Sequence, residues 1–133
     1  MNIWLVCVGE PLICDGENVR LRRMGMLAEY LALRNHQVHF FSASFDHYQK
    51  RQRCETDVSW DIDGRYTLHL IKANGYDKNV SLQRIIHHYI TAYRFKTIVR
   101  GMEKHDIIIC SMEPLEVSYA IVQYAKKNNI KVI

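Results

Sequence analysis

The sequence predicts an α/β domain built on a mainly parallel, doubly wound sheet, and three observations lead to that prediction. Short apolar runs at 2–8, 38–41 and 106–110 have the continuous hydrophobicity of strands that are buried on both faces. Segments with helical periodicity lie between these runs. The first two runs and the helix between them form a complete strand–helix–strand unit, which favours a parallel pair joined by a right-handed crossover.

Length and composition favour a single globular domain over residues 1–133. With 48% hydrophobic and 24% charged residues, the chain can bury one sizeable core. The net charge of +4 favours anionic partners in general, but the basic residues are dispersed and form no recognition-helix pattern, so no nucleic-acid partner is expected. The four cysteines have no CxxC spacing, and Cys7 and Cys110 lie inside apolar strand-like runs, which indicates reduced core thiols. Neither a metal nor a cofactor is expected.

The first helix is expected to begin after a ten-residue loop, with Asp15 or Asn18 as its cap. Asn35 suits the left-handed position that ends such a helix. The buried stripe is predicted from apolar residues at helical spacing, which are Met24, Leu27, Ala28 and Leu31.

Three arginines crowd the start of this helix, namely Arg20, Arg22 and Arg23. Each cation there opposes the positive end of the helix dipole at a cost of roughly 0.3–1 kcal/mol. Arg20 lies four residues before Met24 and is expected to face the mouth of a crevice, where Gly16 and the free N–H groups of the helix would help it bind an anion. The alternative is that the arginines form surface ion pairs with nearby carboxylates, those of Asp15, Glu17 and Glu29. The loop lacks a GxGxxG pattern, so a dinucleotide fingerprint is absent.

The crevice is expected where the strand order reverses, between the strands at 2–8 and 106–110. Loops 9–18 and 111–113 would flank it. The loop "SASFDHYQKRQR" after the second strand either adds a polar, cationic wall or is solvated. The two interpretations are evenly balanced for His47, and the solvated one is favoured for Arg51 and Arg53.

The second half of the chain adds a hairpin at 58–71, in which Asp63-Gly64 forms the turn. Ser81 is predicted to cap a long helix that runs to about Met102. Pro114 suits the first turn of a further helix, and a last strand begins at 130–133.

The long helix is expected to bury one face and expose the other. The predicted buried face carries Leu82, Ile85, Ile86, Tyr89, Ala92 and Tyr93. The predicted outer face carries Arg84, His87, Thr91 and Arg94. A basic face flanked by aromatic residues suits an anionic membrane surface, so the helix at 82–102 is a candidate for such contact, although a merely solvated face is the alternative. No stretch approaches the ~20 apolar residues of a membrane span, and no secretory signal is present. We therefore expect a cytoplasmic protein that contacts the inner membrane face peripherally.

Three segments together resemble a known family. They are the first strand with its glycine-containing loop, "RRMGMLAEYLALRNHQVHFFSASFDH" and "HDIIICSMEPLEVSYAIVQYAKKNNIKVI". The whole resembles the N-terminal half of a bacterial family 4 glycosyltransferase of the GT-B fold, in which two Rossmann-like domains face each other across a cleft. The resemblance implies that the N-terminal domain receives the acceptor and that an absent C-terminal domain holds most of the nucleotide-sugar.

The resemblance also implies roles for particular residues. The donor-phosphate loop would comprise Gly16, Glu17, Asn18 and Arg20. The acceptor side would include Ser44, His47, Ser111 and Glu113. Glu113 is a secondary candidate for the catalytic base, which is otherwise expected outside this chain. The loop reads "CDGEN" where the family commonly has paired glycines, and Glu113 stands where proline is common.

The implied activity is metal-independent transfer of a sugar from a nucleotide-sugar to a saccharide or lipid-linked acceptor during synthesis of a cell-surface polysaccharide. Because the sequence stops on an apolar strand, we expect a sheet that is incomplete at its C-terminus and a polypeptide that is inactive alone. The alternative is a non-catalytic Rossmann-like or flavodoxin-like module that binds a nucleotide or a partner.

Overall fold

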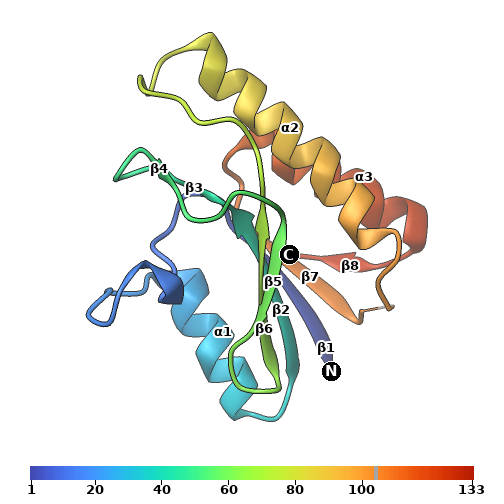
Figure 1. Ribbon diagram of the computed structural model, residues 1–133. Helices are drawn as coiled ribbons and strands as arrows, with labels where there is room; N and C mark the ends of the chain where they lie inside the picture. The colour runs from blue at the N-terminus through green and yellow to red at the C-terminus, as the bar shows by residue number, and fades with distance from the viewer. Residues whose placement is uncertain (104) are drawn as a thin grey trace.

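A computed structural model describes residues 1–103 and 105–133 and shows a mixed α/β domain, with helices on both sides of a central sheet (Figure 1). The elements in chain order are β1 (Asn2–Val6), a 3₁₀ turn η1 (Ile13–Asp15), α1 (Arg23–Leu33), β2 (Gln37–Ala43), β3 (Phe45–Asp46), β4 (Arg51–Gln52), β5 (Val58–Asp61), β6 (Tyr66–Ile71), α2 (Leu82–Val99), β7 (Ile107–Cys110), α3 (Leu115–Asn128) and β8 (Lys131–Val132).

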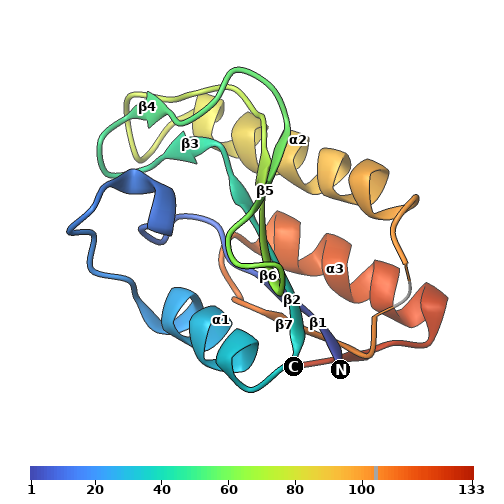
Figure 2. The same ribbon diagram turned by 60° about the horizontal axis from the view of Figure 1, so that its bottom comes forward.

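The main sheet has six strands among the described residues, in the order β5-β6-β2-β1-β7-β8. Its pairs are parallel except for the edge hairpin of β5 and β6, and β3 and β4 form a separate antiparallel pair. Figure 2 shows α1 on one side of the strands and α2 and α3 on the other. This arrangement confirms the predicted α/β class with a mostly parallel sheet, and it is compatible with a Rossmann-like fold.

The sheet separates two apolar cores, and β1 contributes to both because successive side chains of a strand point to opposite faces. Trp4 and Val6 pack with residues of α2 and α3, while Ile3 and Leu5 pack beneath α1. The continuous apolar run of β1 is therefore explained by its central position, with β2 on one side and β7 on the other.

Several local predictions are confirmed. Asn35 has a φ of 66° just after α1, in the left-handed region that the sequence predicted. In the hairpin turn, Gly64 has a φ of 78° and the Asp63 carboxylate accepts the backbone N–H groups of Arg65 and Tyr66. The Ser81 side chain accepts the N–H of Arg84 and caps α2.

The start of the first helix was predicted wrongly. Helix α1 begins at Arg23, so Arg20 precedes it in non-helical chain and is not on its buried face. A residue far away in the sequence satisfies one of the free N–H groups at the helix start: the Glu10 carboxylate accepts the N–H of Met24 at 3.1 Å. Asp15 is engaged elsewhere, and no side-chain cap is present at Arg22. A carboxylate beside the first turn also supplies the negative charge that the arginines there require.

The buried face of α2 was also predicted wrongly. His87 and Thr91, expected outside, are buried together with Ala92, Phe95 and Val99. The polar pair is tolerated because its hydrogen bonds are satisfied: the His87 Nδ1 lies 2.5 Å from the Asn74 carbonyl oxygen, and the Thr91 hydroxyl donates to the His87 carbonyl. Of the apolar face predicted to be buried, only Ala92 is inside. The others face solvent or lie partly exposed, namely Leu82, Ile85, Ile86, Tyr89 and Tyr93.

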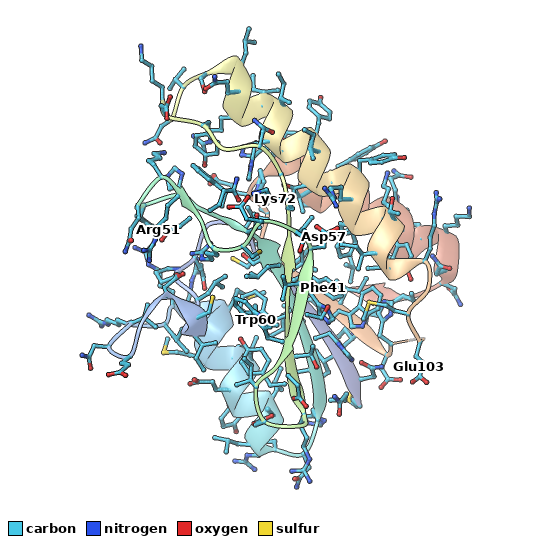
Figure 3. All side chains as sticks on the ribbon, in the orientation of Figure 1. Phe41, Arg51, Asp57, Trp60, Lys72 and Glu103 are labelled. Carbon is cyan, nitrogen blue, oxygen red and sulfur yellow. The ribbon has the colours of Figure 1, made fainter. Side chains whose placement is uncertain are left out.

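Asp57 ties the outer face of α2 to the hairpin edge of the sheet. Its carboxylate accepts the backbone N–H of Lys72 at 2.7 Å and pairs with the Arg94 guanidinium at 2.6 Å. Figure 3 shows Asp57 and Lys72 next to each other beside the strands. Arg94 thus belongs to a local ion pair on the outer face.

Candidate functional site

The carboxyl ends of β1, β2 and β7 open onto a hollow of about 770 Å³, which we call the switch-point hollow because the strand order reverses at β1. The loops after β1 and β7 lie side by side there, and the Ser111 N–H donates to the Val6 carbonyl at 2.9 Å. The residues that line the hollow are Val8, Gly9, Phe45, His47, Tyr48, Tyr76, Asn79, Val80, Ser81, Leu82, Arg84, Ile85, His87, His88, Glu113, Pro114, Leu115 and Glu116.

A histidine–carboxylate pair spans the hollow from α2 to α3. The His88 Nδ1 lies 3.3 Å from the Glu116 Oε2, and both side chains are at least three-quarters buried. Burial lowers the pKa of His88 and the charge of Arg84 lowers it further, and together they outweigh the Glu116 carboxylate, which raises it; this balance favours the neutral imidazole. A neutral imidazole held at Nδ1 by a carboxylate has its other nitrogen free to accept a proton.

A second pair joins His47 to Tyr76. The His47 Nδ1 and the Tyr76 hydroxyl oxygen are 2.7 Å apart, within hydrogen-bonding distance. Burial, with further contributions from Lys50 and Arg84, lowers the pKa of His47. The Lys50 ammonium lies 4.5 Å from the centre of the Tyr76 ring. This side of the hollow therefore presents an imidazole and a phenol, and the Lys50 cation packs against the phenol ring.

Arg84 adds a fixed positive charge at the N-terminus of α2. Its Nη1 donates to the Asn79 carbonyl at 2.8 Å, and its buried Nε has no hydrogen-bond partner in the described part of the chain. The first turn of α2 carries no acidic residue. The guanidinium and the positive end of the helix dipole therefore both favour a negatively charged or hydroxyl-rich ligand in this hollow.

Of the four residues assigned to the acceptor side, two line the switch-point hollow and two form hydrogen bonds that hold neighbouring loops and strands in place. His47 and Glu113 line the switch-point hollow. Ser44 is fully buried and donates to the Gln52 side chain at 2.7 Å, so it holds β3 and β4 together. The Ser111 hydroxyl donates to the Glu113 carbonyl and shapes the loop after β7.

The residues assigned to the donor-phosphate loop lie away from the switch-point hollow. Gly16 and Asn18 line a separate hollow of about 400 Å³, together with Asp46 and Tyr48. Glu17 and Arg20 are exposed and line neither hollow. The expectation that Arg20 looks into the crevice is therefore wrong, because that side chain lies on a loop that runs outside it.

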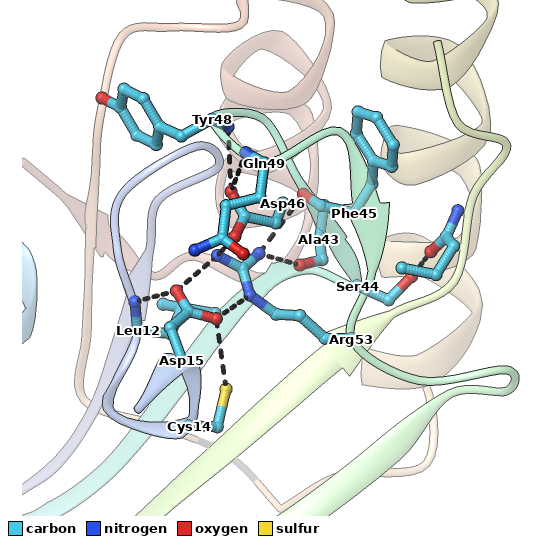
Figure 4. Close-up of polar contacts among 11 residues, drawn as sticks. Leu12, Cys14, Asp15, Ala43, Ser44, Phe45, Asp46, Tyr48, Gln49 and Arg53 are labelled. Atoms are coloured by element: carbon cyan, nitrogen blue, oxygen red, sulfur yellow. Dashed lines mark hydrogen bonds and ion pairs between the residues drawn. The ribbon is translucent and has the colours of Figure 1, made fainter. Parts of the chain in front are cut away.

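Arg53, which the sequence placed in a solvated loop, instead forms a buried ion pair. Its guanidinium donates to both oxygens of the Asp15 carboxylate and to the carbonyls of Ala43 and Phe45 (Figure 4). The Arg53 and Asp15 side chains are only 5% and 8% exposed, and Asp46 lies 3.9 Å from the same guanidinium. This cluster fixes the loop after β1 against the loop after β2, and so holds one wall of the site in place.

Four of the polar residues in the hollow were not predicted from the sequence as site residues: Tyr76, Arg84, His88 and Glu116. One signal could have found Arg84, because Ser81 predicts the start of α2 and an arginine three residues later lies in its first turn. Within the part of the chain that the structure describes, no cluster of three or more metal-ligating side chains occurs.

Comparison with known proteins adds no relative. No protein-family model matches the chain, and no curated protein matches it in sequence. The chemistry of the switch-point hollow and the resemblance carried by the quoted segments are the two grounds for assigning a function.

Proposed function

We propose that this chain is the acceptor-side, Rossmann-like domain of a GT-B glycosyltransferase, with a saccharide or lipid-linked saccharide bound in the switch-point hollow. The observation that carries the proposal is the His88–Glu116 pair, which together with Arg84 and the His47–Tyr76 pair lines a hollow large enough for a sugar. Hydroxyl groups of a sugar can both donate to and accept from such side chains. A nucleotide-sugar would approach from a second domain.

The geometry suits removal of a proton from an acceptor hydroxyl. As the hydroxyl oxygen bonds to the anomeric carbon of the donor and the bond to the nucleoside diphosphate breaks, the proton would pass to the free nitrogen of His88. Glu116 would stabilise the imidazolium that forms, because it already lies beside Nδ1. Glu113, which lines the same hollow, is the alternative acceptor of that proton.

Binding of saccharides to residues 1–133 tests the first half of this proposal. Saturation-transfer NMR with a panel of monosaccharide and disaccharide glycosides should reveal binding that His88→Gln and Arg84→Gln each weaken by about tenfold, the effect of one hydrogen bond to a charged or polarised group. Arg65→Gln is the matched control, because Arg65 is exposed and contacts Asn35 far from the hollow. Binding of nucleotides without any saccharide would contradict the proposal and favour a nucleotide-binding module.

Transfer itself is tested on a longer chain. Residues 1–133 are expressed together with the donor-binding domain that the proposal requires and assayed for release of nucleoside diphosphate from a panel of nucleotide-sugars. A folded, extended protein that binds saccharides but releases no nucleoside diphosphate with any donor would refute sugar transfer.

The outer faces of α2 and α3 support a membrane partner. Large apolar side chains are exposed on these helices and just before them. We call this set the α2–α3 apolar surface, and four of its members also line the switch-point hollow; it comprises Val80, Leu82, Ile85, Ile86, Tyr89, Tyr93, Met112, Leu115 and Tyr119. Helix α2 carries no carboxylate. Asp57 pairs with its Arg94, but Arg84 and Lys96 form no ion pair within the described residues, and their charge is complementary to anionic lipid. In the described residues no helix combines the length and hydrophobicity that crossing a bilayer requires. We therefore propose that this surface rests on an anionic bilayer and presents the hollow to a lipid-linked acceptor.

Vesicle sedimentation tests the membrane contact. The protein should sediment with vesicles that contain phosphatidylglycerol and much less with pure phosphatidylcholine. Ile86→Ser combined with Tyr89→Ser should abolish most of the binding, while Leu33→Ser, a change at a 79% exposed leucine on α1, should not alter it. The proposed contact would be refuted if Leu33→Ser reduced vesicle binding as much as the double variant does. It would also be refuted if the protein sedimented equally with both kinds of vesicle.

A further inference from the structure

A second hollow lies at the opposite ends of α2 and α3, where both helices finish. Its volume is about 940 Å³, and it shares no lining residue with the switch-point hollow. We call it the helix-end hollow. The residues that line it are Lys96, Val99, Arg100, Met102, His105, Gln123, Tyr124, Lys127, Asn128, Asn129 and Ile130.

The charge of the helix-end hollow is entirely positive over its described lining. Lys96 and Arg100 come from the end of α2, and Lys127 comes from the last turn of α3. No Asp or Glu lies among the described lining residues, and none of the three cations forms an ion pair within the described chain. The other polar side chains of the lining are three amides, the His105 imidazole and the Tyr124 phenol; the amides are those of Gln123, Asn128 and Asn129. Cations and amides without carboxylates form a lining that favours an anion.

One wall of this hollow holds an aromatic stack that contains a buried imidazole. The His105 ring lies 3.5 Å from the Trp4 ring, centre to centre, and 5.9 Å from the Tyr124 ring, nearly parallel to both. His105 is only 6% exposed, and neither of its ring nitrogens forms a well-aligned hydrogen bond among the described residues, although a weaker contact with the Glu103 backbone raises its pKa against the lowering by burial. Buried polar groups are seldom left without a well-aligned hydrogen bond, and an oxygen of a ligand in the hollow could supply one to this ring.

We propose that the helix-end hollow binds a phosphate group, either as inorganic phosphate or as a phosphate ester. The phosphate lies between Lys96, Arg100 and Lys127, and an oxygen of the ligand accepts the ring N–H of His105. The competing explanation is that the three cations only offset the negative ends of the two helix dipoles. The chain offers a matched pair that separates the two, since Lys126 and Lys127 both lie in the last turn of α3 but only Lys127 lines the hollow.

Fluorescence of Trp4 gives a direct readout of binding, because its ring stacks on His105. The chain has two tryptophans, so Trp60→Phe leaves Trp4 as the sole reporter. Inorganic phosphate and a sugar phosphate are titrated separately into this variant at constant ionic strength, with sodium chloride as the ionic control. We expect a saturable change with a phosphate ligand and none with chloride, and a matching shift of the His105 ring signals in NMR spectra.

Two further variants complete the test. Lys127→Gln should weaken phosphate binding by about tenfold, the loss of one charge-assisted hydrogen bond, whereas Lys126→Gln should leave the affinity unchanged. If the sugar phosphate binds more tightly than inorganic phosphate, the amide side chains of the hollow contact the sugar part of the ester. An effect of phosphate no larger than that of chloride, or equal weakening by the two lysine variants, would overturn the proposal. Saccharide binding in the switch-point hollow is read separately, so either proposal can fail alone.

Discussion

Replacement of Arg53 by methionine should destabilise the protein strongly, because it removes the partner of a buried carboxylate. The guanidinium donates two hydrogen bonds to Asp15 and two to backbone carbonyls, all in a cluster with little solvent access. After the substitution, the described donors that remain to Asp15 are the Leu12 N–H and the Cys14 thiol, which is a weak donor at 4.0 Å. Leaving one charge of a buried pair uncompensated typically costs about 3–5 kcal/mol. That is a large part of the roughly 5–15 kcal/mol by which a domain is stable.

The assay is urea unfolding followed by circular dichroism at pH 7, with Arg51→Met as the control. Arg51 is exposed and two residues away on β4, so its removal should cost less than about 0.5 kcal/mol. Arg53→Met combined with Asp15→Asn should be more stable than the sum of the single losses predicts, with a coupling of about 2 kcal/mol. If Arg53→Met costs no more than Arg51→Met, or if the two changes add, the ion pair does not hold these loops together.

The pH dependence of that pair follows from Asp15. Burial raises the pKa of its carboxyl, but the hydrogen bonds and charge of Arg53 outweigh this effect and hold the pKa below 3.8. A depressed carboxyl pKa stabilises the fold at higher pH, and that contribution disappears as the pH falls through the folded-state value. Arg53→Met should therefore reduce the acid sensitivity of unfolding below about pH 4, the ordinary range of an aspartate.

Three further predictions concern stability. Burial lowers the pKa of His69 and of His105 to about 4, so the fold is most stable above pH 6.5, where both rings are neutral. Between about pH 6.5 and 4 the free energy of unfolding, measured with urea, should fall by up to about 3 kcal/mol for each ring. A free energy that does not change with pH over this range would contradict the burial of the two rings. Asn35→Ala should cost about 1 kcal/mol because alanine resists the left-handed conformation, while Asn35→Gly should cost little, and equal losses would exclude this cause. Phe95→Ala should lower the free energy of unfolding by about 3–5 kcal/mol, because the ring is fully buried beside Trp4 and Phe41. Thermal or urea unfolding measures this loss. A loss below about 1 kcal/mol would mean that the core does not depend on this ring.

The sequence determined the features that depend on neighbouring residues. The apolar run of β1 predicted a central strand, Asp63-Gly64 predicted the hairpin turn, and Asn35 predicted the left-handed end of α1. Each signal depends on a few adjacent residues whose backbone preferences are expressed before any distant contact forms. The α/β class followed from the same local patterns.

Only the tertiary structure decided which face of α2 is buried. Its apolar residues predicted one face, yet His87 and Thr91 face inwards, because each finds a hydrogen-bond acceptor in a nearby backbone carbonyl. Periodicity measures hydrophobicity along one helix and does not show whether buried polar groups will be satisfied.

The candidate site also depends on the tertiary structure, because contacts between residues far apart in the sequence form it. Asp15 and Arg53 meet from loops that follow different strands, and His88 meets Glu116 from two helices. Ion pairs of this kind form only when the packing of the sheet and helices brings their elements together. Sequence patterns therefore predicted the edge of the sheet where the switch-point hollow lies, but the side chains that line the hollow depended on how α2 and α3 pack against the strands.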